Sequence, residues 1–198
     1  MKLYLNTASP FARLCRVLLV ETGLEKDTEL VMTDPWAKDE KLLGANPAGK
    51  IPALSLEDGT HLVESSCIAD FLMLRSGAVW LSPLSHENPA ERLEVLGLAR
   101  AAIDCSFGAV IQERFAPGSP LIERWTSALP RIAERLGQLY GRRKRSPDCD
   151  LGDLTTAVAF DYVGFRLPQV DWRKKAGPLV ECLAVLSARS SLASTKPK

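Results

Sequence analysis

Apolar residues along this 198-residue chain follow two kinds of spacing, and the spacing changes near residue 77. Before that point, short runs of alternating apolar and polar residues are separated by runs with helical spacing; beyond residue 88 only helical spacing is found. The pattern predicts strands at 2–6, 28–32, 52–56 and 61–63, helices at 10–22 and 65–75, and an irregular helical segment at 34–46. The predicted order is β-α-β-α-β-β-α, which is an α/β arrangement.

The rest of the chain is predicted to be all-α. Residues 77–88 show no periodic pattern and are expected to form a linker between a domain at 1–76 and an all-helical domain at 89–198. Pro130 is expected to kink one of the later helices or to mark its true start, and SSLASTKPK at the end of the sequence is interpreted as a polar tail. The predicted helices of this part lie at 89–114, 119–141, 151–166 and 176–187.

Two of the predicted helices carry clear start signals. Ser9 and Pro10 have the residue types preferred at an N-cap and at the first helical position, and Gly23 is a typical stop. Asp150 precedes the helix at 151–166 and Asp153 stands three residues later, as in a capping box. We expect Asp150 to act in folding rather than in chemistry.

The segment NPAGKIPAL, residues 46–54, contains the chain's main candidate binding feature. Pro52 stands at the start of a predicted strand, where it cannot donate a hydrogen bond to the sheet. If the Ile51–Pro52 bond is cis, the backbone groups of Ile51 point outward and can pair with an extended peptide. Glu64 and Ser65 open the next helix, whose free amides attract a carboxylate. Together these features suit a small anionic peptide.

These motifs resemble the glutathione S-transferase family. NPAGKIPAL, the following ESSCIADFL at 64–72, the opening MKLYLNTASPFARLCRVLLVETG and the later DLGDLTTAVAFDYVGFR all fit that family, and their arrangement is similar to its bacterial YibF-like branch. The resemblance implies a thioredoxin-like N-terminal domain followed by a C-terminal helical bundle. It also implies glutathione as a co-substrate, no metal or prosthetic group, and a homodimer.

The resemblance assigns roles to individual residues. Ser9 would be the catalytic residue, with its hydroxyl and the helix dipole favouring the glutathione thiolate; a cap without catalytic function explains the same residue. Asn6, Thr7 and Tyr4 are alternatives for the sulfur contact. The expected glutathione-binding residues are Ser9, Phe11, Lys50, Ile51, Pro52, Glu64 and Ser65, with Lys38 as a second choice for the cation that meets the glycyl carboxylate.

The expected activity is addition of the glutathione thiolate to a hydrophobic electrophile. Arg100, Asp104 and Phe107 are the candidates for a second-substrate pocket, which is expected between the two domains. Two alternatives stay open: a non-catalytic interaction protein of the same fold, and a glutathione-dependent peroxidase or reductase. A dithiol redox cycle is excluded at this site because the helix begins Ser-Pro-Phe-Ala, without cysteine.

Composition removes several other classes of function. The net charge of +1 disfavours nucleic acid, and the run at 142–145, RRKR, is expected to be a solvated loop. Five scattered cysteines without a CxxC spacing and two distant histidines argue against a disulfide framework and a metal site, and Cys15 and Cys67 are expected in the core. No stretch has the length of a membrane span or the pattern of a signal peptide, so we expect a cytoplasmic protein.

Overall fold

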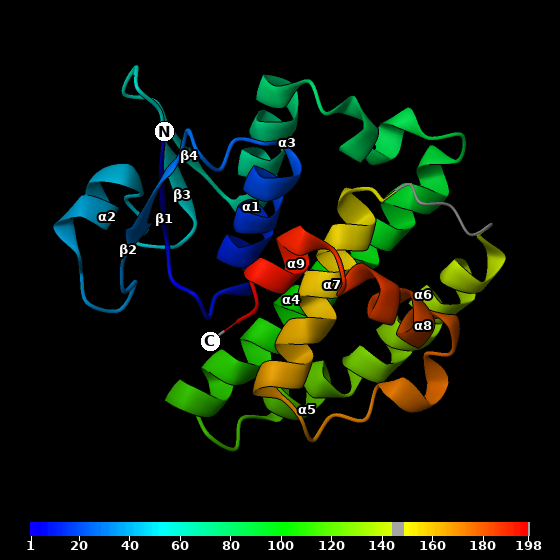
Figure 1. Cartoon of the computed structure of the whole chain (residues 1–198). Coiled ribbons are helices and arrows are strands. Elements are labelled where there is room, and N and C mark those ends of the chain that lie inside the picture. Colours follow the sequence, from blue (N-terminus) through cyan, green and yellow to red (C-terminus); the bar gives the residue numbers. More distant parts are fainter. Residues whose placement is uncertain (144–148, 198) are drawn as a thin grey trace. The chain divides into compact units, whose positions relative to one another are not determined.

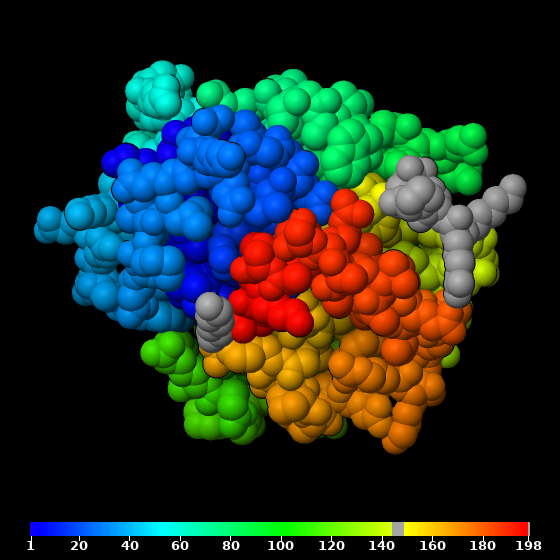
Figure 2. Space-filling view, in the orientation of Figure 1, coloured from blue at the N-terminus to red at the C-terminus, as the bar shows by residue number. Residues whose placement is uncertain are grey.

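The computed structural model describes residues 1–143 and 149–197. The chain forms two compact units, Met1–Val79 together with Ser194–Lys198, and Trp80–Ala193. The first unit is the blue to blue-green part of Figures 1 and 2, together with the last residues at the red end of the colour scale. The division between the units falls inside the segment predicted as a linker, where the chain makes two 3-10 turns, Val79–Leu81 and Pro83–Ser85.

The first unit is built on a four-stranded mixed sheet. β1 pairs in parallel with β2 and antiparallel with β3, and β3 pairs antiparallel with β4, so that the strand order is β2-β1-β3-β4. The strands are β1 (Lys2–Leu5), β2 (Glu29–Met32), β3 (Ala53–Ser55) and β4 (His61–Val63). The predicted order of elements in this part of the chain is confirmed.

Helices cover both faces of this sheet. Figure 1 shows α1 (Pro10–Glu21) and α3 (Ser65–Ser76) on one face and α2 (Glu40–Ala45) on the other. Because successive strand residues point to opposite faces, Leu3 is fully buried, whereas Tyr4 packs against a cluster that includes Leu42 of α2. The first unit is therefore a three-layer α/β structure with a small second core under α2.

The second unit is helical. Its long helix α4 (Pro89–Phe115) contacts α5, α6 and α7, and α8 contacts α6 and α7. α7 (Leu151–Arg166) is buried on every side over its first ten residues, which is the pattern of a central helix. The remaining helices are α5 (Pro120–Thr126), α6 (Ala128–Arg142), α8 (Pro178–Leu186) and α9 (Ser190–Ser194), and a 3-10 turn lies at Arg173–Lys175.

Three element predictions were wrong in whole or in part. The single helix expected at 119–141 is two helices separated at Ser127, and Pro130 is the third residue of α6, close to its true start, where a proline removes no intrahelical hydrogen bond. Only Glu40–Ala45 of the segment 34–46 is helical, because Asp39 caps the helix there by accepting a hydrogen bond from the Lys41 amide.

The polar tail expected at 190–198 was the third error. Residues 190–194 form α9, and the side chains of Ser191 and Leu192 are buried, as is that of the following Thr195. Their spacing places them on one side of the chain, so a segment of polar composition still has a buried face.

Candidate functional site at one end of the sheet

Strand register brings the predicted site segments together. Tyr4 of β1, Ala53 of β3 and Val63 of β4 lie directly opposite one another in a single cross-strand row. Because β3 runs antiparallel to both of its neighbours, the chain leaves β1, enters β3 and leaves β4 at the same end of the sheet. The segments beyond that row contain Ser9, Ile51–Pro52 and Glu64–Ser65.

Ser9 is the N-cap of α1. Its Oγ accepts a hydrogen bond from the Ala12 amide at 3.2 Å, and its own amide donates to Asn6 Oδ1 at 2.8 Å. A hydroxyl has both lone pairs and a proton, so the cap leaves the Ser9 O–H available as a donor, and no acceptor for it is found in the part of the chain that the structure describes. Asn6 Oδ1 also accepts from the Ala8 amide, so the Asn6 side chain stabilises this turn with two hydrogen bonds.

The Ile51–Pro52 peptide bond is cis. Pro52 is buried, and Ile51 is half-buried against the cluster of Leu42, Ala45 and Ala53 beneath α2. The side chain of Ile51 is thus held by the core, while its backbone lies at the sheet end. Lys50, which precedes it, is exposed.

Glu64 is the N-cap of α3 and has φ 69° and ψ 126°. A non-glycine residue with positive φ is strained by about 1–3 kcal/mol and persists only where its surroundings impose it. The side chain is exposed and makes no cap hydrogen bond, so neither burial nor capping accounts for a carboxylate here. Ser65 follows as the first residue of α3, beside the free amides of the helix N-terminus.

The loop between β2 and α2 begins at the same end of the sheet, because β2 runs parallel to β1. Lys38 in this loop is exposed and has φ 51°. Thr33 Oγ1 donates to Asp39 Oδ2 at 2.7 Å, and this bond together with the Lys41 amide lowers the pKa of Asp39. The loop therefore carries a fixed carboxylate next to the second-choice lysine.

Several other predicted residues have defined places. Phe11 is half-buried in the first turn of α1. Tyr4 packs against the cluster under α2, on the sheet face opposite Leu3 and Leu5. Arg100, Asp104 and Phe107 belong to the second unit and follow one another along one stripe of α4; Arg100 and Phe107 are half-buried and Asp104 is exposed.

The start of α7 holds a buried cluster of charges. Asp150 and Asp153 form the predicted capping box in both directions. Arg143 donates to Asp153 at 2.7 Å and Arg92 to Asp150 at 3.2 Å, while Tyr140 donates its hydroxyl to Asp153 at 2.7 Å. Burial, followed by the charge of Asp153, raises the pKa of Asp150. The contacts are those of a structural network that joins α4, α6 and α7.

Two predictions about charged and thiol residues were wrong in part. Arg143 is not solvated, because it forms the ion pair just described; Arg142 is exposed, and residues 144–145 of the basic run lie outside the described residues. Cys15 is in the core, but Cys67 is exposed in the first turn of α3. Neither difference has a local sequence signal, because each depends on which way a helix faces.

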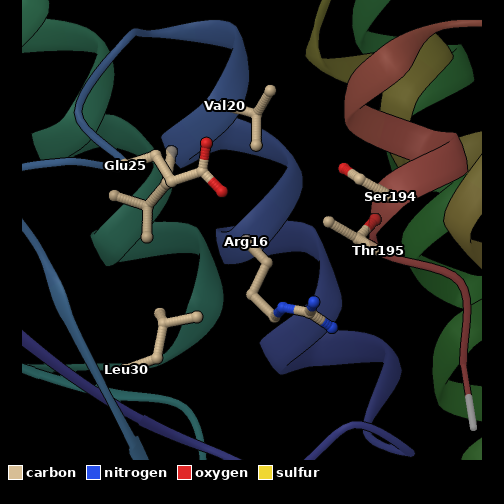
Figure 3. Close-up of a pocket in the computed structure, with 7 residues that line it drawn as sticks. Arg16, Val20, Glu25, Leu30, Ser194 and Thr195 are labelled. Carbon is tan, nitrogen blue, oxygen red and sulfur yellow. The ribbon is translucent and has the colours of Figure 1, made fainter.

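A pocket elsewhere in the first unit shares no residue with the predicted site. Figure 3 shows Ser194 and Thr195 across the pocket from Glu25 and Leu30, with Arg16 between them. Burial and the neighbouring Arg13 lower the pKa of Arg16, while Glu25 raises it. The pocket lies along the C-terminal half of α1, away from the helix N-terminus that carries Ser9.

Within residues 1–143 and 149–197 there is no cluster of three or more His, Cys, Asp or Glu side chains arranged to hold a metal ion. A search of the same residues finds no helix with the length and apolar character needed to cross a membrane.

Comparison with known proteins identifies relatives of the whole chain. Residues 8–73 match the family model described as glutathione S-transferase, N-terminal domain. The uncharacterized GST-like protein YibF of Escherichia coli strain K12 is 27% identical in an alignment that spans all of this chain and 98% of that protein.

Solved structures resemble the chain over its full length. A glutathione S-transferase from Methylobacterium radiotolerans, in complex with glutathione sulfonate, has a TM-score of 0.86 and 27% identity, covering 99% of this chain and 94% of that one. A glutathione transferase family member from Pseudomonas fluorescens Pf-5 with bound glutathione has a TM-score of 0.78 and 29% identity, covering 100% and 98%. Both protein structures contain a glutathione-type ligand.

Proposed function

Since the chain belongs to the glutathione S-transferase family, we propose that it binds glutathione at the sheet end described above and transfers the glutathione thiolate to a hydrophobic electrophile. One observation carries the proposal: a helix N-terminus with a hydroxyl, the backbone of Ile51 and the strained Glu64 all leave the same end of one sheet. These groups match the thiol, the peptide backbone and the charged γ-glutamyl end of glutathione.

Each part of the tripeptide has a proposed partner. The backbone of Ile51 pairs with the cysteinyl residue, as an added strand would. The Glu64 carboxylate meets the γ-glutamyl ammonium, and the γ-glutamyl carboxylate accepts from Ser65 and the first amides of α3. Lys50, or failing that Lys38, meets the glycyl carboxylate. Phe11 and Pro52 flank the thiol.

The chemical contribution of the protein is the ionisation of that thiol. The Ser9 hydroxyl donates to the sulfur, and the positive end of the α1 dipole favours its negative charge. A thiol with a pKa near 8.5 is about 3% ionised at pH 7, and lowering the pKa by about two units raises this to about 75%. The gain in thiolate concentration is about 25-fold, partly offset by lower nucleophilicity.

The proposed reaction is balanced without a further reactant. The thiol proton passes to solvent, the sulfur lone pair forms a bond to an electrophilic carbon, and either a leaving group departs with its electron pair or the resulting carbanion takes a proton. Arg100, Asp104 and Phe107 of α4 are the proposed contacts of the electrophile. We propose no metal, and a homodimer acting in the cytoplasm.

Replacement of Ser9 tests the catalytic step. In Ser9→Ala we expect kcat/KM to fall about 10- to 30-fold with an activated aryl halide, because the thiolate fraction falls towards its value in water; the Kd for glutathione in calorimetric titration should change less than about threefold. The pKa of bound glutathione, followed by thiolate absorbance, should rise towards 8.5.

Ser119→Ala is the matched control, because Ser119 caps α5 in the second unit and also precedes a proline. Both variants should lose about 1 kcal/mol of helix-cap stability, but only Ser9→Ala should lose activity. Unchanged turnover in Ser9→Ala would show that Ser9 caps α1 and has no catalytic role. Absence of glutathione binding by the unmodified protein would contradict the proposed function and favour a non-catalytic interaction protein.

A further inference from the structure

Asn46 is a buried polar residue between α2 and β3 that the proposed site does not use. It is 5% exposed and forms the C-cap of α2, where its amide donates to the Leu42 carbonyl at 2.7 Å. Its carbonyl accepts from the Gly49 amide at 2.8 Å. Its backbone thus ends the helix and closes the turn that follows.

The Asn46 side chain binds the same turn at two further points. Oδ1 accepts from the Ala48 amide at 3.0 Å, and Nδ2 donates to the Lys50 carbonyl at 2.8 Å. Since a backbone amide can only donate and a carbonyl can only accept, these partners determine the orientation of the side-chain amide. Pro47 and Pro52 have no N–H to contribute, so Asn46 is the centre of the turn's hydrogen bonding.

The bond to Lys50 has a consequence for the next residue. A peptide unit is planar, and in the trans form its carbonyl and its N–H point in opposite directions. Holding the Lys50 carbonyl towards Asn46 therefore turns the Ile51 N–H away from the turn. No acceptor for this N–H is found among the described residues, and it is one of the two Ile51 backbone groups assigned above to glutathione.

We propose that Asn46 is a positioning residue for glutathione: its side chain holds the peptide between Lys50 and Ile51 so that the Ile51 N–H faces the cysteinyl carbonyl. The inference rests on the proposed function and adds to it a residue that does not touch the ligand. Burial of Asn46 matters because water cannot readily take over the bond to Lys50 when the side chain is changed.

Asn46→Asp tests this with almost no change of shape. The carboxylate still accepts from Ala48, but it cannot donate, and it faces the Lys50 carbonyl with a negative charge. We expect the Kd for glutathione, and the KM for glutathione in turnover, to rise about tenfold, which corresponds to about 1.4 kcal/mol. The kcat at saturating glutathione should stay within about twofold, because Ser9 and α1 are unaffected.

Asn88→Asp is the matched control. Asn88 is exposed at the N-cap of α4, where its side chain makes no cap hydrogen bond. Asn88→Asp therefore introduces the same charge without removing a cap hydrogen bond. Its Kd and KM for glutathione should equal those of the unmodified protein. An Asn46→Asp protein with unchanged Kd and KM would overturn the inference, and so would a fall in kcat without a rise in KM.

A ligand-free measurement separates the inference from the proposed function. Trypsin can cleave after the exposed Lys50, and a turn released from Asn46 should be cleaved several times faster in Asn46→Asp than in the unmodified protein. If the unmodified protein does not bind glutathione, the proposed function and the ligand role of Asn46 both fail. Faster cleavage would then support only the control of the turn by Asn46, and unchanged cleavage would overturn that as well.

Discussion

The hydroxyl of Ser9 shows how one side chain can serve folding and chemistry together. Sequence reasoning treats the cap and the sulfur contact as competing explanations. The geometry removes the competition, because the Ala12 amide uses a lone pair of Oγ and leaves the proton. Asn6, a rival for the sulfur contact, accepts from two amides of the turn through its carbonyl oxygen, and these bonds leave its side-chain N–H groups as donors.

At Glu64 the backbone is strained and the side chain does not offset the strain. Positive φ destabilises the fold, and the exposed carboxylate makes no cap hydrogen bond to α3 that would compensate. Strained residues are found where the surrounding structure imposes a costly backbone conformation, often at a binding site. Glu64 lies at the end of the sheet that the other candidate residues share. The sequence contains no signal for this φ, because it depends on how β4 joins α3.

Glu64→Gly and Glu64→Ala together separate the two effects. Glycine accepts positive φ, so Glu64→Gly should raise the free energy of unfolding by about 1 kcal/mol after allowance for its greater freedom in the unfolded chain. Glu64→Ala keeps the strain and should change stability by less than about 0.5 kcal/mol. Both should weaken glutathione binding at least about tenfold, since both lose the carboxylate.

Urea unfolding and calorimetric titration measure the two quantities separately. Equal stability of the glycine and alanine variants would show that φ at Glu64 is not strained. Unchanged glutathione affinity in both would remove Glu64 from the proposed site.

At the scale of elements, close helix contacts depend on glycines. A Cβ placed on Gly137 of α6 would lie 2.2 Å from the carbonyl oxygen of Ala176, and one on Gly108 of α4 would lie 2.7 Å from the Trp125 ring of α5. The first neighbour is backbone and the second a large side chain, so neither can move away easily. These glycines allow approaches that no larger residue permits.

Gly137→Ala should therefore lower the free energy of unfolding by about 2–3 kcal/mol, as overpacking does. The matched control is Gly97→Ala on the exposed side of α4, where a Cβ meets nothing within 4 Å and should stabilise by up to about 1 kcal/mol. Urea unfolding of both variants gives the comparison. A neutral Gly137→Ala would mean that α6 and the segment at Ala176 can separate without loss.

Element boundaries were predicted well where their signals are local. The starts of α1 and α7 follow from Ser9 and Asp150, whose caps involve residues within three positions. The break at Ser127 and the helix at 190–194 were missed, because they depend on what the segment packs against rather than on its own composition. Local chemistry ends a helix, whereas distant contacts decide whether a polar segment is buried.

At the scale of the whole molecule, both units bury groups that ionise at alkaline pH. Burial raises the pKa of the Cys15 thiol in the first unit and that of Cys182 to about 11 in the second. Burial and the nearby charge of Asp153 raise the pKa of the Tyr140 hydroxyl. In the unfolded chain these groups return to ordinary values.

Stability should therefore fall as the solution becomes alkaline. Each of these groups has a higher pKa in the folded than in the unfolded chain, so the unfolded chain releases its proton first as the pH rises. The stability of the folded state is therefore unaffected below about pH 8.5 and falls as the pH rises towards the folded pKa. For Cys15 alone the slope of the unfolding free energy approaches about −1.4 kcal/mol per pH unit above pH 9.5.

Cys15→Ala should flatten that slope by about the same amount, whatever its effect on stability at pH 7. Cys67→Ala, which removes an exposed cysteine of the same unit, is the control. Urea unfolding between pH 8 and pH 10.5 measures the slopes. Equal slopes in the unmodified protein and in Cys15→Ala would show that Cys15 ionises alike in the folded and unfolded chain.

The sequence by itself determined the order of strands and helices in the first unit, the caps of α1 and α7, and the candidate residues, because spacing, prolines and caps act over a few neighbouring positions. Only the tertiary structure decided that the segments of Ser9, Ile51 and Glu64 share one end of the sheet and that Glu64 has positive φ. It also decided that Arg143 forms an ion pair with Asp153 and that the Asn46 side chain donates to the Lys50 carbonyl. Those features arise from strand register and packing between residues far apart in the chain, which no local pattern encodes.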